Sequence, residues 1–290
     1  MTGARCSRVG AALLLLLLAG CSGDQPVAQP ALPSSPATSA PTPTPTPTPT
    51  SRTQQGTVPP VWLGTRPLPL RADGYGQTRP TPPELDPRRF TLPDTIAPLP
   101  GDGFASVVEK VPAEVLARST WEPGCPVAAA DLAYVRLTFW GFDDRRHTGE
   151  LLLNAEVARD VVGVFRRLYT ARFPFEELRI TARAELDAPP TGDGNGTGSF
   201  VCRPTTGSDT TYSQHAYGLA IDLDPFQNPY IKGDLVLPEL ASSYLDRDRV
   251  RPGMITADGV VVRAFAEIGW TWGGTWSSLK DYQHFSRNGR

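Results

Sequence analysis

The chain has 290 residues, with 28 lysine and arginine residues against 30 aspartate and glutamate residues, and four cysteines. A formal net charge of −2 provides no basic field that collects phosphates, so nucleic acid is not expected as a partner. Of the 31 prolines, 20 lie in residues 1–100, whereas 22 of the 25 aromatic residues lie in residues 101–290. Core-forming residues are therefore concentrated in residues 101–290, which are predicted to form one sizeable domain.

Residues 1–20 are predicted to be an export signal. Two arginines precede a short apolar run at 11–18, and small residues follow it. The run is shorter than a membrane-spanning helix needs. The motif Leu18-Ala19-Gly20-Cys21 resembles the bacterial lipobox, in which the signal is cut before a cysteine that then carries lipid. We expect an extracytoplasmic lipoprotein held to the cell membrane through Cys21; an ordinary cleaved signal with a chance cysteine is the alternative.

The next segments are rich in proline. Residues 21–58 hold the lipidated cysteine and a Pro/Thr-rich linker, with five Pro-Thr dipeptides at 41–50. Such a chain favours the polyproline II conformation and cannot collapse into a core. Residues 59–100 remain proline-rich but contain large apolar side chains such as Trp62 and Phe90. They either wrap the domain as an extended arm or continue the linker, and the sequence leaves both open.

The pattern of residues 101–290 predicts an α+β domain. We expect helices at 112–118, from an Asn154 cap to about 172, and at 258–268; strands at 132–142, 178–185, 219–223 and 281–285; a loop at 188–197; and a Gly-interrupted aromatic segment at 270–276. Strands and helices do not alternate regularly, which favours a mixed or antiparallel sheet flanked by helices over a doubly wound parallel one.

The cysteine count predicts one disulfide. Cys6 leaves with the signal and Cys21 takes the lipid, so Cys125 and Cys202 remain as a pair. A bridge between them is the default in an oxidising compartment. Two buried thiols are the alternative, and a nucleophilic Cys202 is a weaker one.

Two of the three histidines lie in polar sequences near the C-terminus. His215 and Asp222 are separated by a turn that contains Gly218, so the chain can fold back and aim both at one point. His284 supplies a third ligand from a separate strand. Two histidines and one carboxylate, with an open fourth position, are the composition of a catalytic zinc site. Asp224 is a rival ligand, because it lies two positions beyond Asp222 on the same strand face.

The two motifs together resemble a known family. Ser-x-His-x-x-Gly-x-Ala-x-Asp at 213–222, followed by Asp-x-x-His at 281–284, is similar to the zinc D-alanyl-D-alanine carboxypeptidases, the VanY-like group of the LAS superfamily. The resemblance spans about residues 105–290. It implies the α+β zinc-peptidase fold that this superfamily shares with hedgehog domains.

The same resemblance implies a role for each matching residue. His215, Asp222 and His284 match the zinc ligands, Asp281 matches the catalytic acid/base, and Arg203 matches an arginine that binds the substrate or the transition state. Zinc in such sites makes hydroxide available at neutral pH, and the base moves its proton to the leaving amine. Several branches of the family carry glutamate at the base position, where this chain has the shorter aspartate.

Further residues are candidates for the substrate groove. Ser213 precedes the first predicted ligand by two and is expected to support its loop by hydrogen bonding. Trp272 and Trp276 either line the groove or belong to the core, and we include Trp272 among the substrate-binding candidates. His147 has no partner motif and is interpreted as a turn or surface residue.

These observations lead to one functional hypothesis and one main alternative; a zinc amidase or a peptidase acting on free peptides is a weaker option. The hypothesis is a membrane-anchored, zinc-dependent carboxypeptidase or endopeptidase that hydrolyses the peptide stems of peptidoglycan. The alternative is a non-catalytic, zinc-containing module that binds the cell wall or another partner. Asp281 argues against the alternative, because a purely structural zinc site needs no base.

Overall fold

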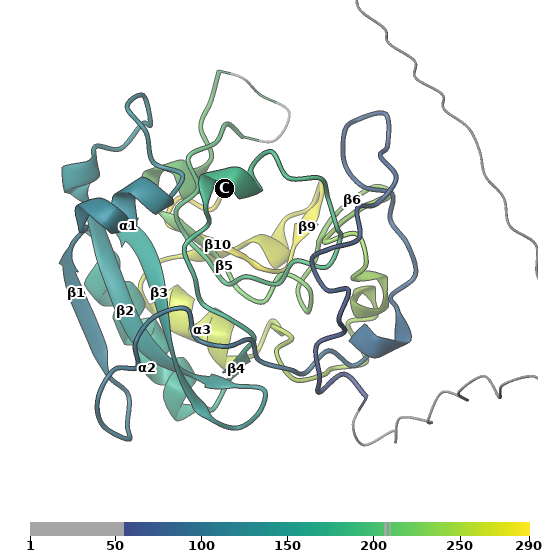
Figure 1. The fold of residues 1–290 in the computed structure, drawn as a ribbon, viewed down its shortest axis with the longest axis horizontal. Coiled ribbons are helices and arrows are strands. Elements are labelled where there is room, and N and C mark those ends of the chain that lie inside the picture. The colour runs from purple at the N-terminus through teal and green to yellow at the C-terminus, as the bar shows by residue number, and fades with distance from the viewer. Residues whose placement is uncertain (1–54, 206–207, 209) are drawn as a thin grey trace, which may run out of the picture. The chain divides into compact units, whose positions relative to one another are not determined.

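The computed structural model describes residues 55–205, 208 and 210–290 (Figure 1). The predicted signal, Cys21 and most of the predicted linker lie outside these residues. The described part contains the helices α1 (Ala113–Arg118), α2 (Ala158–Thr170) and α3 (Val260–Glu267). Its strands are β1 (Ser106–Lys110), β2 (Leu132–Gly141), β3 (Arg146–Asn154), β4 (Pro174–Phe175), β5 (Ala220–Asp222), β6 (Tyr230–Lys232), β7 (Leu235–Leu237), β8 (Thr271–Trp272), β9 (Lys280–Asp281) and β10 (His284–Ser286). No helix in this part is long and apolar enough to cross a membrane.

The largest sheet joins β1, β2 and β3 in antiparallel order, and β4 pairs with β2 in parallel. The alternating apolar residues of β2, such as Val135 and Leu137, are buried in one cluster with α2 and α3, as the sequence pattern predicts. Strand β3 was not predicted from the sequence. Its residues from Thr148 to Leu153 are all buried, so the strand shows no alternation of apolar and polar side chains.

Helix α2 begins later than the sequence suggested. Asn154 is the last residue of β3, and its Oδ1 accepts a hydrogen bond from the Glu156 amide at 3.1 Å instead of capping a helix. The helix starts at Ala158 and buries the predicted apolar face, which includes Val161 and Phe165. It packs against both β2 and α3.

The strand expected at 178–185 does not form. Leu178 makes a single parallel bridge with Thr197, and Arg183–Glu185 is a turn of 3₁₀-helix. An alternating sequence becomes a strand only where a neighbouring strand satisfies its backbone hydrogen bonds, and here only Leu178 and Arg179 make such bonds.

Two smaller antiparallel sheets divide the last predicted strand between them. One has the order β5-β10-β8 and the other the order β7-β6-β9. The chain leaves the second sheet after Asp281, which pairs with Tyr230, and enters the first at His284, which pairs with Asp222. The break at residues 282–283 therefore places neighbouring residues in two different sheets.

The proline-rich residues from 55 to 100 pack against the domain. Trp62, Leu85 and Phe90 form a buried cluster with Phe226 and Tyr244. Along this stretch, dark blue in Figure 1, the chain runs as turns and extended segments with one turn of 3₁₀-helix at Pro83–Leu85, and it reaches β3 at Leu99.

A disulfide joins Cys125 and Cys202, whose Cα atoms are 5.9 Å apart. The bridge packs beside a third buried cluster that includes Val115 and Phe200. It links the segment that follows α1 to the segment that precedes the His215 turn.

Candidate metal centre and cleft

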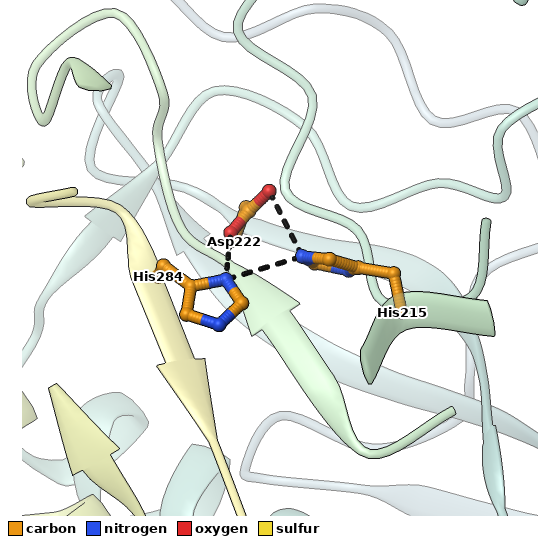
Figure 2. A group of neighbouring side chains, drawn as sticks. All are labelled: His215, Asp222 and His284. Atoms are coloured by element: carbon orange, nitrogen blue, oxygen red, sulfur yellow. Dashed lines mark hydrogen bonds and ion pairs between the residues drawn. The ribbon is translucent and has the colours of Figure 1, made fainter. Parts of the chain in front are cut away.

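Three side chains from different elements converge at the junction of β5, β10 and a short 3₁₀ turn (Figure 2). Asp222 ends β5, and His284, which begins β10, lies directly across the ladder from it. His215 comes from the turn Gln214–Tyr217, which Ser213 caps by accepting the His215 amide hydrogen at 3.3 Å. The predicted ligand set is therefore assembled from two strands and one turn.

Gly218 makes the turn after His215 possible. It has a φ of +67°, a left-handed conformation that glycine adopts without steric cost. A Cβ at this position would also lie 2.5 Å from the Asn154 amide nitrogen, which donates to the Gly218 carbonyl. The glycine thus allows the turn to pack directly on the end of β3 while the chain reverses toward Asp222.

The ligand atoms of the three residues lie within 4.8 Å of one another. His215 Nε2 is 3.2 Å from His284 Nδ1 and 3.3 Å from Asp222 Oδ2. Asp222 Oδ1 lies 3.1 Å from His284 Nδ1. Both histidines are buried.

The hydrogen bonds on the far side of each ring fix which nitrogen carries the lone pair. His215 Nδ1 lies 2.6 Å from the Ser199 carbonyl oxygen, and His284 Nε2 lies 3.1 Å from the Arg290 carbonyl oxygen. A carbonyl oxygen only accepts, so each of these nitrogens carries the hydrogen. The remaining nitrogens, His215 Nε2 and His284 Nδ1, therefore face each other with lone pairs.

This arrangement fits a divalent metal ion. Two imidazole lone pairs and a carboxylate directed at one point repel one another unless positive charge lies between them. Two nitrogens at ~2.1 Å from a tetrahedral zinc ion stand roughly 3.4 Å apart, close to the separation of the two imidazole nitrogens here. Two histidines and one carboxylate also leave the fourth position for water or substrate, as catalytic zinc sites do.

The carboxylates of the site have opposite electrostatic surroundings. Burial alone would raise the pKa of Asp222, but the positive charge of the neighbouring His215 and His284, when these are protonated, holds it far below its usual range. Burial and the Asp222 charge raise the pKa of Asp281 to about 7, although His284 and the Arg203 guanidinium act in the opposite direction. Asp281 Oδ1 is buried and has no hydrogen-bond partner among the described residues. A carboxylate in this state is suited to exchanging a proton near neutral pH.

The ligand cluster forms part of the lining of a cleft of about 500 Å³. Its walls include Arg203, Ser213, Tyr212, Tyr230, Lys232, Trp276, Asp281 and Arg290. Tyr230 and Lys232 are alternate residues of β6 and share one of its faces. A larger hollow of about 760 Å³ lies between the proline-rich segment and the loop at 188–196, but the residues that line it include no histidine.

The structure places the other candidate residues as follows. Arg203 and Ser213 line the cleft, whereas Trp272 does not: it is buried in the core, and its Nε1 donates to the Tyr282 carbonyl. Trp276 is the tryptophan that reaches the cleft. Asp224 points away from the cluster, and its Oδ1 accepts the Glu176 amide hydrogen at 3.2 Å. A φ of +40° at Asp224 breaks the strand alternation that made it a rival ligand.

Three residues near the site escaped the sequence analysis. Ser199 and Arg290 act through backbone carbonyls, which leave no signal in the side-chain pattern. Lys232 lies on a short strand beyond the recognised motifs. The sequence signal that could have identified Lys232 is its spacing of two residues from Tyr230, which puts both side chains on one face of a strand.

The three ligand residues could hold one metal ion, and they line the same cleft as Asp281. Residues 206–287 match the family model described as D-alanyl-D-alanine carboxypeptidase. The match includes His215, Asp222, Asp281 and His284, and it confirms the predicted resemblance over this segment. Searches of curated proteins and of solved structures found no match. Residues 206–287 are therefore similar to peptidases of the D-alanyl-D-alanine carboxypeptidase type.

Proposed function

We propose that this protein is a zinc-dependent peptidase that hydrolyses the peptide stems of peptidoglycan, as a D-alanyl-D-alanine carboxypeptidase does. One observation supports the proposal more than any other: His215, Asp222 and His284 direct three electron-pair donors to one point, and Asp281 lies beside them with a free carboxylate oxygen. The match to the carboxypeptidase family covers all four residues.

The residues have distinct roles in this proposal. His215, Asp222 and His284 hold the zinc ion, which when bound polarises water and the scissile carbonyl group. Asp281 accepts a proton from the attacking water at its carboxylate and returns it to the leaving amine. Arg203 offers a guanidinium at the cleft wall, where it binds a substrate carboxylate.

The location of the protein is part of the proposal. We propose that Cys21 carries the lipid and that residues 22–58 connect the membrane to the peptidase domain. The anchor and the linker fit a substrate in the cell wall, because a lipid anchor keeps the domain on the side of the membrane where the wall lies. Residues 22–54 lie outside the described part of the chain.

Digestion of purified muropeptides tests the proposed activity. The zinc-loaded protein and a chelator-treated sample are incubated with stem peptides, and the products are identified by mass spectrometry. We expect loss of a terminal residue, or cleavage within the stem, in the zinc-loaded sample only. Binding of the stems without cleavage would favour the wall-binding module, and equal cleavage in the metal-free sample would overturn the zinc mechanism.

A further inference from the structure

The segment from Ser199 to Arg203 contacts the predicted metal ligand His215 through Ser199 at one end. At the other end it carries Arg203, the cation proposed to bind the substrate. The Ser199 carbonyl accepts the His215 Nδ1 hydrogen at 2.6 Å, and the Val201 amide donates to the His215 carbonyl at 3.2 Å. The Arg203 carbonyl accepts the Ser213 amide hydrogen at 3.2 Å. The segment therefore runs beside the His215 turn and ends at the cleft wall.

The Ser199 end of the segment is held separately, by a hydrogen bond to β5. Ser199 Oγ donates to the Ala220 carbonyl at 2.7 Å, and the Phe200 side chain is buried. These contacts fix the carbonyl that orients His215. Neither contact includes a hydrogen bond to Arg203.

The Arg203 end is held by a different part of the chain. Cys202 is joined to Cys125 by the disulfide, and its amide donates to Thr120 Oγ1 at 2.9 Å. Thr120 is fully buried, so its hydroxyl has no water to replace this bond. Tyr212 reaches the same region, because its hydroxyl donates to the Gly124 carbonyl at 3.0 Å.

The Arg203 side chain has little positioning of its own. Within the described residues its guanidinium makes one hydrogen bond, from Nη1 to the adjacent Pro204 carbonyl at 3.2 Å. Its place in the cleft is therefore set mainly by its backbone. Arginine binds a carboxylate best through two parallel hydrogen bonds, which require a defined position and orientation.

We propose that Thr120 and the Cys125–Cys202 disulfide are positioning residues that hold Arg203 at the cleft wall for the terminal carboxylate of a peptide substrate. The inference rests on the proposed function. Because His215 is oriented from the other end of the segment, release of the Cys202 end weakens substrate binding and leaves the metal site in place.

A pair of substitutions at Thr120 tests the inference. Thr120→Val keeps the shape of the side chain and removes the hydroxyl oxygen that accepts the Cys202 amide hydrogen. Thr120→Ser keeps this hydroxyl. We expect Thr120→Val to raise KM for a stem peptide on the order of tenfold, with kcat and zinc content unchanged. Thr120→Ser should restore the wild-type KM. For the same peptide with an amidated C-terminus, Thr120→Val should leave KM unchanged.

A second set of variants addresses the disulfide. The double variant Cys125→Ser/Cys202→Ser should show the same rise in KM, again without loss of zinc. Tyr169→Phe is a matched control for hydroxyl removal, because the Tyr169 hydroxyl donates to the Asp102 carbonyl away from the cleft. This control should behave as wild type.

The outcomes separate the inference from the function on which it rests. If the wild type cleaves the stem peptide and neither set of variants changes KM, the inference alone is overturned. Loss of zinc in parallel with the rise in KM also overturns it, since the metal site would then depend on the Cys202 end. A wild type that cleaves no stem peptide overturns the proposed function and the inference together.

Discussion

His215 Nε2 and His284 Nδ1 face each other at 3.2 Å, and each ring gives its other nitrogen to a backbone carbonyl. The two carbonyls belong to Ser199 and Arg290, which lie far apart in the sequence. They select the tautomer of each ring and so make both facing nitrogens electron-pair donors. The backbone around the site is thus arranged for a cation before any ion binds.

Metal binding should therefore stabilise the folded protein. At a free zinc concentration a hundred times Kd, a ligand that binds only the folded state adds about 2.7 kcal/mol to the free energy of unfolding. We expect zinc to raise Tm by several degrees and His215→Ala to abolish this rise. His147→Ala is the control, because His147 pairs with Asp94 and Asp143 outside the cluster. Equal zinc-induced shifts in both variants would contradict the assigned site.

The second prediction separates metal binding from proton transfer. Asp281→Asn keeps the size of the side chain but removes the carboxylate, so hydrolysis should fall by about 10²–10⁴-fold while zinc content stays at the wild-type level. Asp281→Glu lengthens the side chain and restores the residue that several branches of the resembling family carry. We expect it to retain measurable activity. Full hydrolysis by Asp281→Asn would exclude Asp281 as the base.

How much of the site the sequence predicts depends on where each interaction is encoded. His215, Asp222 and His284 lie in short motifs whose side chains and glycine turn are visible in the sequence, and the structure brings all three together. The tautomers depend on backbone carbonyls, which every residue has, so no residue type marks Ser199 or Arg290.

The elements of the fold likewise divide into those that the sequence predicts and those that it does not. In β2 the apolar Val135 and Leu137 alternate with the polar Arg136 and Thr138, so this strand was predicted correctly. Strand β3 is buried on both sides and lost that signal. The residues at 178–185 alternate but lack a neighbouring strand, so their pattern misled. Trp272 and Trp276 look equivalent in sequence, and only the pairing of Trp272 with Phe285 in the β8–β10 ladder assigns it to the core.

The third prediction concerns the buried ion pair between Arg88, in the proline-rich segment, and Glu176. Two hydrogen bonds of 2.6 and 2.7 Å join them, and both side chains are almost fully buried. Arg88→Met leaves the Glu176 carboxylate without its cation, which should lower the free energy of unfolding by about 3–5 kcal/mol. Chemical denaturation measures this loss. The double variant Arg88→Met/Glu176→Leu should recover much of it.

The same ion pair predicts how the stability of the Arg88→Met variant changes with pH. Burial raises the pKa of Glu176, and removal of Arg88 takes away a group that lowers it. In the folded Arg88→Met variant the pKa of Glu176 then lies above its value in the unfolded chain. The stability of this variant therefore falls as pH rises from the unfolded pKa through the folded pKa. The loss relative to wild type should therefore shrink as pH is lowered toward the ordinary carboxyl range. A loss that grows at lower pH would contradict an uncompensated Glu176 charge.

The fourth prediction tests the charge of the cleft wall. Lys232 is exposed on β6 and lines the same cleft as the metal ligands, so Lys232→Glu places a negative charge where the proposed anionic stem peptide would bind. We expect KM to rise severalfold, with the difference from wild type reduced at high ionic strength. Lys110→Glu, at the exposed end of β1, is the matched charge reversal away from the cleft. Equal effects of the two substitutions would indicate a general charge effect.

The last prediction concerns the anchor at Cys21. Two acyl chains on a diacylglycerol hold a protein to a membrane stably, whereas one chain gives only marginal binding. Cys21→Ala removes the proposed site of attachment, so the protein should move from the detergent phase to the aqueous phase in a two-phase extraction of cells. Cys6→Ala is the control, because the proposed cleavage removes Cys6 with the signal and would leave the mature protein unchanged. Retention of Cys21→Ala in the detergent phase would show that another feature of the chain holds it to the membrane.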